Sequence, residues 1–314
     1  MSIYLIAPLY NEEDILPKLF DRLDNLKKLL PQELKFALVD DGSTDNTKAF
    51  ITEKALEDNS YIAVILSRNY GHQYAVTAGM SYCQEAEAIM IIDGDLQDPP
   101  ELIIDFYQKL QEGYDVVYAV RRKRKESWIK KMAYSFYYRL LKRVALINIP
   151  LDSGDFCMIS NRVLRHMNKM PERSRYLRGM RAWVGFKQYG FEYERDGRHG
   201  GVSKYSFSKL LQLAFSGLIN FSHFPIHFMS MIGGISIVIS ILYIIYAIYL
   251  KVVFNSTPIG FVSIIIAISF FSGIILLSLS LLGEYIIRIF DDVRNRPLFI
   301  VDELIKNKEI LKNE

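Results

Sequence analysis

The expected fold is decided by the stretch Ala88-Ile-Met-Ile-Ile-Asp-Gly-Asp-Leu-Gln-Asp-Pro-Pro-Glu101. Its apolar half, Ala88–Ile92, has the length of a buried strand, and its second half is acidic and contains a glycine. Four further short apolar runs occur in the first 120 residues, and helix-length segments separate all five. The predicted strands are Ile3–Ala7, Phe36–Val39, Tyr61–Leu66, Ala88–Ile92 and Val116–Val120, and the predicted helices are Glu12–Leu30, Thr44–Asp58, Tyr74–Ala86 and Pro100–Gln111. This alternation predicts an α/β fold with βαβ units and a mostly parallel sheet.

Carboxylates gather where the predicted strands end. Asp40 and Asp41 follow the second strand, and Asp93 and Asp95 follow the fourth. Open parallel sheets bind ligands beyond the carboxyl ends of their strands, where an aspartate is solvated by water or by a ligand. Asp45 and Asp98 are also explained as caps at helix starts, a role that needs only one acid per helix. The four remaining acids predict a ligand site at this edge.

The spacing of Asp93 and Asp95 around Gly94 is typical of a divalent-metal site. Two hard carboxylate ligands suit Mg²⁺ or Mn²⁺, which bind few protein carboxylates together with substrate phosphates. Gln97 could add an amide oxygen two residues further on. Gly94 permits a sharp turn and the close approach of a ligand. We therefore predict a metal–diphosphate site formed by Asp93, Asp95 and Gln97.

Composition narrows the class of protein. The chain has 314 residues, enough for about two domains, and its 23% of charged residues is normal for a globular protein. A net charge of +3 is too small to indicate a nucleic-acid partner. The two cysteines, Cys83 and Cys157, are too few for a disulfide framework or a zinc site.

The apolar residues concentrate near the C-terminus. Residues 224–250 and 259–283 contain no Asp, Glu, Lys or Arg, and each stretch exceeds the ~20 residues that a membrane-spanning helix needs. A pair of buried helices is the alternative. Basic residues flank the pair on its outer sides, whereas the connecting loop has only Lys251; the flanking residues are Lys204, Lys209, Arg288, Arg294 and Arg296. By the positive-inside rule, both termini are expected in the cytoplasm.

A basic region lies between the predicted sheet and the first apolar stretch. Residues 127–151 contain five Lys and Arg residues and no acid, and apolar residues recur there at helical spacing after Trp128. This pattern is typical of a helix at a membrane surface, with a core-packing helix as the alternative. Residues 205–224 are predicted to form a second interfacial helix. Arg121, the first residue of a basic run at a strand end, is a candidate to bind an acceptor phosphate.

Several motifs together resemble a known family. The motifs are Pro8-Leu-Tyr-Asn-Glu-Glu13, Val39-Asp-Asp-Gly-Ser-Thr-Asp45, Asp93-Gly-Asp-Leu-Gln-Asp-Pro-Pro100, Asp152-Ser-Gly-Asp-Phe156, Arg198-His-Gly-Gly-Val-Ser-Lys-Tyr205, Gly283-Glu-Tyr285 and Arg296-Pro-Leu298. In this order, and with two apolar stretches, they resemble the family-2 glycosyltransferases of GT-A fold. Within these they are similar to the polyprenyl-phosphate glycosyltransferases, the type of bactoprenol glucosyltransferase and dolichyl-phosphate mannose synthase.

The resemblance implies roles for individual residues. A nucleotide sugar would be bound by Pro8, Tyr10, Glu12, Asp40, Asp41, Arg68 and Asp93, and by Arg198 and Lys204 from a loop that closes over the phosphates. Asp155 occupies the position that such families assign as catalytic base. A sugar-hydroxyl acceptor needs a base, because its proton must leave during attack, whereas a phosphate acceptor is already anionic at pH 7 and does not. Asp155 is therefore either the base or a residue that positions the acceptor or the sugar.

The implied function is metal-dependent, inverting transfer of a hexose to undecaprenyl phosphate, a polyprenyl phosphate, for cell-envelope glycosylation. UDP-glucose is the favoured donor and GDP-mannose the alternative. The expected organisation is a nucleotide-sugar-binding core at 1–126, an acceptor and lid region at 127–223, two transmembrane helices at 224–283 and a cytosolic tail at 284–314. The expected location is the plasma (inner) membrane, and homo-oligomers are possible.

Two rival functions are less favoured. A processive polysaccharide synthase would need more spans and a Gln-x-x-Arg-Trp motif, to which the nearest match is Arg181-Ala-Trp183. A nucleotide-sugar-binding membrane protein without activity is disfavoured because metal, lid and acceptor elements all occur together.

Overall fold

The structure is a computed structural model that describes residues 2–29, 32–121, 153–173, 175–193, 224–254 and 260–312. The chain forms two compact units. The first contains nearly all residues up to 206 and, in addition, residues 297–314; the second contains the apolar segments of residues 207–296. The C-terminal segment therefore returns to the unit that contains the N-terminus.

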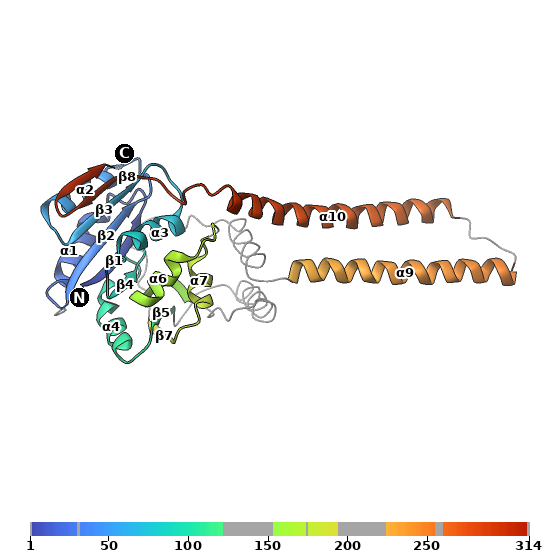
Figure 1. Cartoon of the computed structure of the whole chain (residues 1–314), viewed down its shortest axis with the longest axis horizontal. Helices are drawn as coiled ribbons and strands as arrows, with labels where there is room; N and C mark the ends of the chain where they lie inside the picture. The colour runs from blue at the N-terminus through green and yellow to red at the C-terminus, as the bar shows by residue number, and fades with distance from the viewer. Residues whose placement is uncertain are drawn as a thin grey trace. The chain divides into compact units, whose positions relative to one another are not determined.

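Among the described residues, one sheet of nine strands organises the first unit, in the order β7-β5-β6-β4-β1-β2-β3-β8-β9 (Figure 1). The strands are β1 (Ser2–Leu9), β2 (Glu33–Asp40), β3 (Tyr61–Leu66), β4 (Ala88–Ile91), β5 (Val116–Arg121), β6 (Ser153–Ser160), β7 (Gln188–Tyr193), β8 (Val301–Lys306) and β9 (Glu309–Lys312). β1 pairs in parallel with β2 and β4, and β2 pairs in parallel with β3. β6 and β8 run antiparallel to their neighbours. The carboxyl ends of β1–β5 and the amino end of β6 thus share one edge.

Helices cover both faces of this sheet. One face packs against α1 (Leu16–Leu26), α2 (Thr47–Glu57) and α4 (Ile103–Gln111), the last preceded by the short 3₁₀ turn η1 (Pro100–Leu102). The other face packs against α3 (His72–Tyr82), α6 (Asn161–Lys169) and α7 (Leu177–Trp183). Strand residues alternate between the two cores, so that Ile3 and Leu5 belong to one and Tyr4 and Ile6 to the other. The period-two pattern of strands explains this division.

The predicted α/β fold with a mostly parallel sheet is confirmed, and each strand and helix expected in residues 1–120 is present within a few residues of its predicted bounds. Sequence reasoning did not identify β6 and β7, or the last two strands, β8 and β9. β8 adds to β3 in antiparallel register, with Val64 opposite Leu304 and Ala63 opposite Ile305. Ile305 is completely buried, so the C-terminal segment contributes to the core.

The second unit contains two long helices, α9 (Phe224–Phe254) and α10 (Phe261–Val293), which lie side by side (Figure 1). Each includes 24 residues long and apolar enough to cross a membrane, Met231–Phe254 with mean hydropathy 2.4 and Phe270–Val293 with 1.9. Their large apolar side chains are mostly exposed, for example Leu242 at 60% and Leu276 at 66%. A pair of core helices would bury these side chains, so the alternative of buried helices fits poorly.

Candidate functional site

The loops that follow β1 and β2 hold each other through side-chain-to-backbone hydrogen bonds. The backbone amides of Asn11, Glu12 and Glu13 donate to the side chains of Ser43, Thr47 and Asp45, at 3.0, 3.0 and 3.2 Å. In return, the side chains of Asn11 and Glu13 accept from the amides of Thr44 and Asn46, at 2.8 and 2.9 Å. Asp45 also accepts from the amide of Thr47, as expected of a residue at a helix start. The two loops therefore form one rigid rim.

Asp41 connects this rim to the loop after β3. Its carboxylate accepts from the amides of Tyr70 and Gly71, at 2.7 and 2.9 Å. Asp40, also buried, accepts from the amide of Ser43 at 3.3 Å. Burial raises the pKa of both carboxyls, and these hydrogen bonds oppose the increase. Asp41 thus holds the β3–α3 loop in place, a role beyond its predicted contact with a nucleotide.

The other residues predicted to bind the nucleotide lie at this same edge but differ in exposure. Pro8 is buried within β1, whereas Tyr10, just beyond it, is 39% exposed. Glu12 is half-buried in the rim. Arg68 is exposed and stacks on the Tyr70 ring, with its guanidinium carbon 4.0 Å from the ring centroid. Among these residues, Tyr10 and the Arg68–Tyr70 pair are therefore the most accessible to a ligand from solvent.

The loop after β4 carries the three predicted metal ligands. Asp93 and Asp95 are half-buried, and Gln97 is 5% exposed. Gly94 fits tightly against β1, since a Cβ there would lie 2.8 Å from the Pro8 carbonyl oxygen. Leu96 has a left-handed backbone with φ of 54°, which costs a non-glycine residue about 1–2 kcal/mol. Such a conformation persists where the surrounding structure enforces it, commonly at a functional site.

These residues fit a divalent cation that is completed by its substrate. In the described part of the chain, no three His, Cys, Asp or Glu side chains are arranged to hold a metal by themselves. The protein would therefore supply two carboxylates, a number that suits Mg²⁺ or Mn²⁺ bound to a diphosphate. The buried amide nitrogen of Gln97 has no hydrogen-bond partner among the residues described. Its neighbour Asp98 is fully buried and accepts from the Tyr193 hydroxyl, so the proposed helix-capping role does not describe it.

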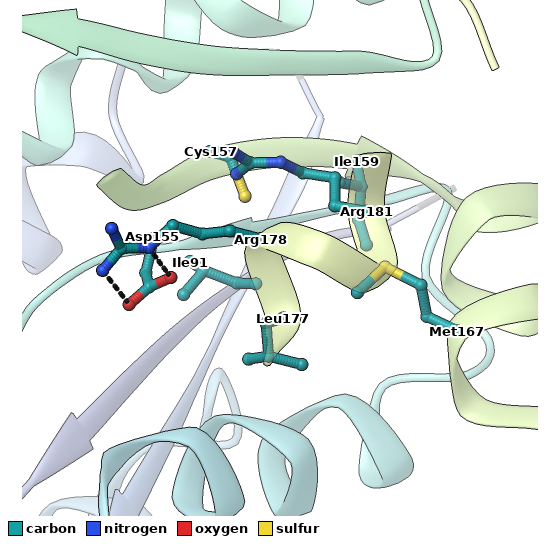
Figure 2. A pocket seen from close by; sticks show the side chains of 8 residues that line it. All are labelled: Ile91, Asp155, Cys157, Ile159, Met167, Leu177, Arg178 and Arg181. Atoms are coloured by element: carbon teal, nitrogen blue, oxygen red, sulfur yellow. Dashed lines mark hydrogen bonds and ion pairs between the residues drawn. The ribbon is translucent and has the colours of Figure 1, made fainter. Parts of the chain in front are cut away.

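Asp155, near the start of β6, is enclosed by three side chains. Arg178 of α7 donates from Nε to Oδ1 at 2.9 Å and from Nη2 to Oδ2 at 3.4 Å, as Figure 2 shows. Gln73 of α3 donates to Oδ2 at 2.9 Å and accepts from the Leu177 amide at 3.0 Å. His72 Nε2 lies 3.5 Å from Asp155 Oδ2 and 3.8 Å from Asp93 Oδ1. His72 therefore connects Asp155 with the predicted metal site.

The charges around Asp155 determine its protonation. Burial alone would raise its pKa, but the Arg178 guanidinium and His72 outweigh burial and hold the pKa of Asp155 well below its usual range. Burial lowers the pKa of His72, whereas Asp155 and Asp93 together raise it. Burial raises the pKa of Asp93 to about 6. A carboxylate held ionised by an arginine is a weak base, so this geometry favours a positioning role for Asp155.

Behind the Asp155–Arg178 pair lies a small cavity with mostly apolar walls (Figure 2). Arg181, one helical turn after Arg178, is 2% exposed and donates to the Gly154 carbonyl oxygen at 3.4 Å. Its guanidinium carbon lies 5.3 Å from the centroid of the Tyr118 ring. Two arginines of α7 thus bind residues at the start of β6, Arg178 at Asp155 and Arg181 at Gly154.

Sequence reasoning missed His72, Gln73 and Arg178. His72 and Gln73 are the last two residues of the polar stretch that follows the third predicted strand. That position at a strand end could have identified them as candidate site residues. Arg178 gives no such signal, because it is 23 residues from Asp155 and meets it only in the folded chain. Arg121 is the last residue of β5 and so lies at the expected edge. Arg198, Lys204, the interfacial helix predicted at 127–151 and all but the last residue of the one predicted at 205–224 fall outside the described residues, and their roles stay predictions.

Comparisons with known proteins match this chain to a family. Residues 4–167 match the family model described as glycosyl transferase family 2. An uncharacterized glycosyltransferase of Bacillus subtilis, YkcC, is 41% identical, covering 99% of this chain and 97% of the relative. The bactoprenol glucosyl transferase of Shigella phage SfII is 34% identical, covering 96% of this chain and 97% of the relative.

Among solved structures, glucosyl-3-phosphoglycerate synthase from Mycobacterium tuberculosis is similar with a TM-score of 0.48 and 14% identity, covering 70% of this chain and 79% of that one. Similarity at that level does not inform on activity. The family match spans more than half of the chain, and the relatives match over nearly all of it. The chain therefore belongs to glycosyl transferase family 2, adopts the GT-A fold and is a glycosyltransferase.

Proposed function

We propose that this glycosyltransferase moves a hexose from a nucleotide sugar to a polyprenyl phosphate at the membrane surface. UDP-glucose is the favoured donor, GDP-mannose the alternative, and undecaprenyl phosphate the favoured acceptor. Relatives of nearly the same length are named bactoprenol glucosyl transferases, at 33–34% identity. The pair of long apolar helices suits an enzyme that acts on a lipid.

The order of groups along the sheet edge is the observation that carries the proposal. The sheet places β3, β2 and β1 in succession, then β4 with Asp93, then β6 with Asp155 and finally β5 with Arg121. A nucleotide sugar with its diphosphate at β4 would extend its base toward β1–β3. Its sugar would then lie toward β6, and an acceptor phosphate would approach from β6 and β5. This order supports the proposal, because base, diphosphate, sugar and acceptor would follow one another along the edge.

Asp93 and Asp95 would hold a divalent cation on the donor diphosphate. Bound there, Mg²⁺ or Mn²⁺ would neutralise charge that develops on the departing nucleoside diphosphate. The phosphate oxygen of the acceptor attacks the anomeric carbon, the bond to the diphosphate breaks, and the configuration inverts. An anionic phosphate oxygen needs no proton removed, which agrees with the paired, ionised state of Asp155.

Chain connectivity supports a location with both termini on one side of the membrane. The sheet contains strands from before α9 and from after α10, namely β1–β7 and β8–β9. If the two helices cross a bilayer, they must cross it an even number of times, because one folded sheet cannot lie on both sides. The basic residues outside the pair support a cytoplasmic location for that side, with the helices proposed to lie in the inner membrane.

The test is a transfer assay with purified full-length enzyme in lipid nanodiscs. Radiolabelled UDP-glucose, GDP-mannose and UDP-linked amino sugars are each supplied with undecaprenyl phosphate and Mg²⁺ or Mn²⁺. We expect a lipid-linked hexose from UDP-glucose, and loss of product in EDTA. No transfer to the lipid from any donor would refute the proposal.

The metal assignment is tested by Asp95→Asn, with Asp105→Asn on the exposed surface of α4 as control. Loss of one anionic ligand should lower turnover by at least about 100-fold, about 2.7 kcal/mol of transition-state stabilisation. The control should keep full activity. An active Asp95→Asn enzyme, or full wild-type activity in excess EDTA, would contradict the assignment.

A further inference from the structure

We infer that Arg178 binds the phosphate of the lipid acceptor, and that Asp155 acts by holding Arg178 in place. The inference rests on the proposed function, because it takes a polyprenyl phosphate as the acceptor. It assigns an acceptor-phosphate ligand in α7 and gives Asp155 a positioning role.

Arg178 lies in α7, on the acceptor side of the site. α7 packs against β6, the strand next to β4 on the side away from β1, β2 and β3. Arg178 therefore lies on the acceptor side of Asp93. His72 marks the boundary, since its Nε2 approaches Asp93 at 3.8 Å and Asp155 at 3.5 Å. A phosphate positioned to attack the sugar must come to this side.

The ion pair with Asp155 fixes the orientation of Arg178. Asp155 takes Nε and one Nη of Arg178, which fixes the plane of the guanidinium. The Asp155 side chain is only 10% exposed, whereas that of Arg178 is 29% exposed. The Asp155 side chain is therefore the more enclosed member of the pair, and Arg178 is the more accessible one. A planar guanidinium held in this way is suited to recognise a phosphate.

Arg178 also supplies positive charge beside Asp155. The divalent cation proposed on Asp93 and Asp95 would be engaged by the donor diphosphate, so an acceptor phosphate that approaches the anionic Asp155 needs another cation beside it. Among the described residues whose contacts reach Asp155, the cationic groups are Arg178 and, when protonated, His72. Gln73 fixes both members of the pair, because it binds Asp155 and the amide of Leu177, the residue before Arg178.

The experiment compares Arg178→Gln and Arg178→Lys with a matched control, Arg162→Gln. Arg162 makes the same side-on pair with Asp115, at 2.8 and 2.6 Å, but at the opposite edge of the sheet. For each full-length variant the apparent KM for undecaprenyl phosphate is measured, together with the Kd for UDP-glucose in the absence of lipid. Thermal unfolding is recorded to identify variants that do not fold.

Arg178→Gln should raise the KM for the lipid by about 10- to 100-fold, the usual effect of losing a charge-assisted hydrogen bond. The Kd for UDP-glucose should stay within about twofold of wild type. Arg178→Lys should be intermediate, since it keeps the charge but loses the fork. Arg162→Gln should leave both constants unchanged.

Asp155→Asn and the double variant Asp155→Asn/Arg178→Gln complete a cycle. If Asp155 acts through Arg178, the double variant should be no worse than Arg178→Gln alone. Additive losses, an unchanged lipid KM in both Arg178 variants, or an equal loss of UDP-glucose affinity would overturn the inference. Absence of any transfer by the wild-type enzyme would instead refute the proposed function.

If Arg178→Gln does not fold, binding of a short-chain, water-soluble prenyl phosphate to Arg178→Lys decides the matter. Weakened binding, with donor affinity retained, supports the inference. Wild-type binding contradicts it.

Discussion

At the scale of single residues, Gly42 shows how closely the loops of the site fit. Its φ is +68°, and a Cβ at this position would lie 2.3 Å from the backbone carbonyl carbon of Arg68. No side chain fits there without displacing the β3–α3 loop. Gly113 has a φ of +89° but open space around the position of its Cβ. A side chain at Gly113 would therefore introduce backbone strain alone, whereas a side chain at Gly42 would introduce both strain and steric overlap.

We predict that Gly42→Ala destabilises the enzyme by about 3 kcal/mol or more, against about 1–2 kcal/mol for Gly113→Ala, because only Gly42→Ala adds overlap to the strain of a left-handed backbone. Thermal unfolding of the purified full chain measures both changes. Gly42→Ala should also raise the KM for the nucleotide sugar, because the displaced loop carries Arg68. Equal effects of the two substitutions would show that the loop adapts without cost.

At the scale of elements, β8 connects the second apolar helix to the donor side of the site. β8 pairs with β3. The amide of Ser67, the residue before Arg68, donates to the carbonyl oxygen of Ile300, the residue before β8, at 3.0 Å. Lys48 of α2 also makes ion pairs with Asp302 and Glu303, at 3.2 and 3.4 Å. The chain after α10 thus helps to hold the loop on which Arg68, Tyr70 and His72 depend.

Ile305→Ala tests this connection, with Ile310→Ala in β9 as control. Ile305 is completely buried, and Ile310 is 47% exposed. Truncating the buried side chain should cost about 2–4 kcal/mol of stability and weaken nucleotide-sugar binding, whereas the control should cost less than about 1 kcal/mol. Melting temperature and the Kd for UDP-glucose are the measurements. Unchanged donor affinity in a destabilised Ile305→Ala enzyme would limit β8 to a structural role.

At the scale of the whole molecule, one sheet is built from segments on both sides of the apolar helical pair. If the two helices cross a membrane, as we propose, this arrangement requires an even number of crossings. The loop after α9 and the segment after α10 should therefore lie on opposite sides of the membrane. Lys251, near the end of α9, and Asn295, just after α10, are suitable probes.

We predict that Lys251→Cys reacts with a membrane-impermeant maleimide in intact cells, whereas Asn295→Cys reacts only after permeabilisation. The native Cys83 and Cys157 are buried, so they should contribute little background. Labelling of both probes in intact cells, or of neither, would contradict a two-span arrangement. Gel fluorescence of the purified variants provides the readout.

Features of this protein that depend on residues close together in the chain could be predicted from its sequence. Strand and helix periodicity is local, so the elements of residues 1–120 and the carboxylates Asp40, Asp41, Asp93 and Asp95 at their ends could be predicted. The long apolar stretches were equally local signals, because one charge-free run of residues is enough to recognise them.

Only the tertiary structure decided which groups meet across the sheet. The pairing of Asp155 with Arg178 depends on how α7 packs on β6, and the binding of Gln73 to both depends on α3. β8 pairs with β3 across more than 230 residues, and its short, mixed-charge sequence carries no periodic signal strong enough to predict that partner. Long-range pairs of this kind depend on the closure of large loops around a common core, and a one-dimensional pattern contains no information about where such loops close.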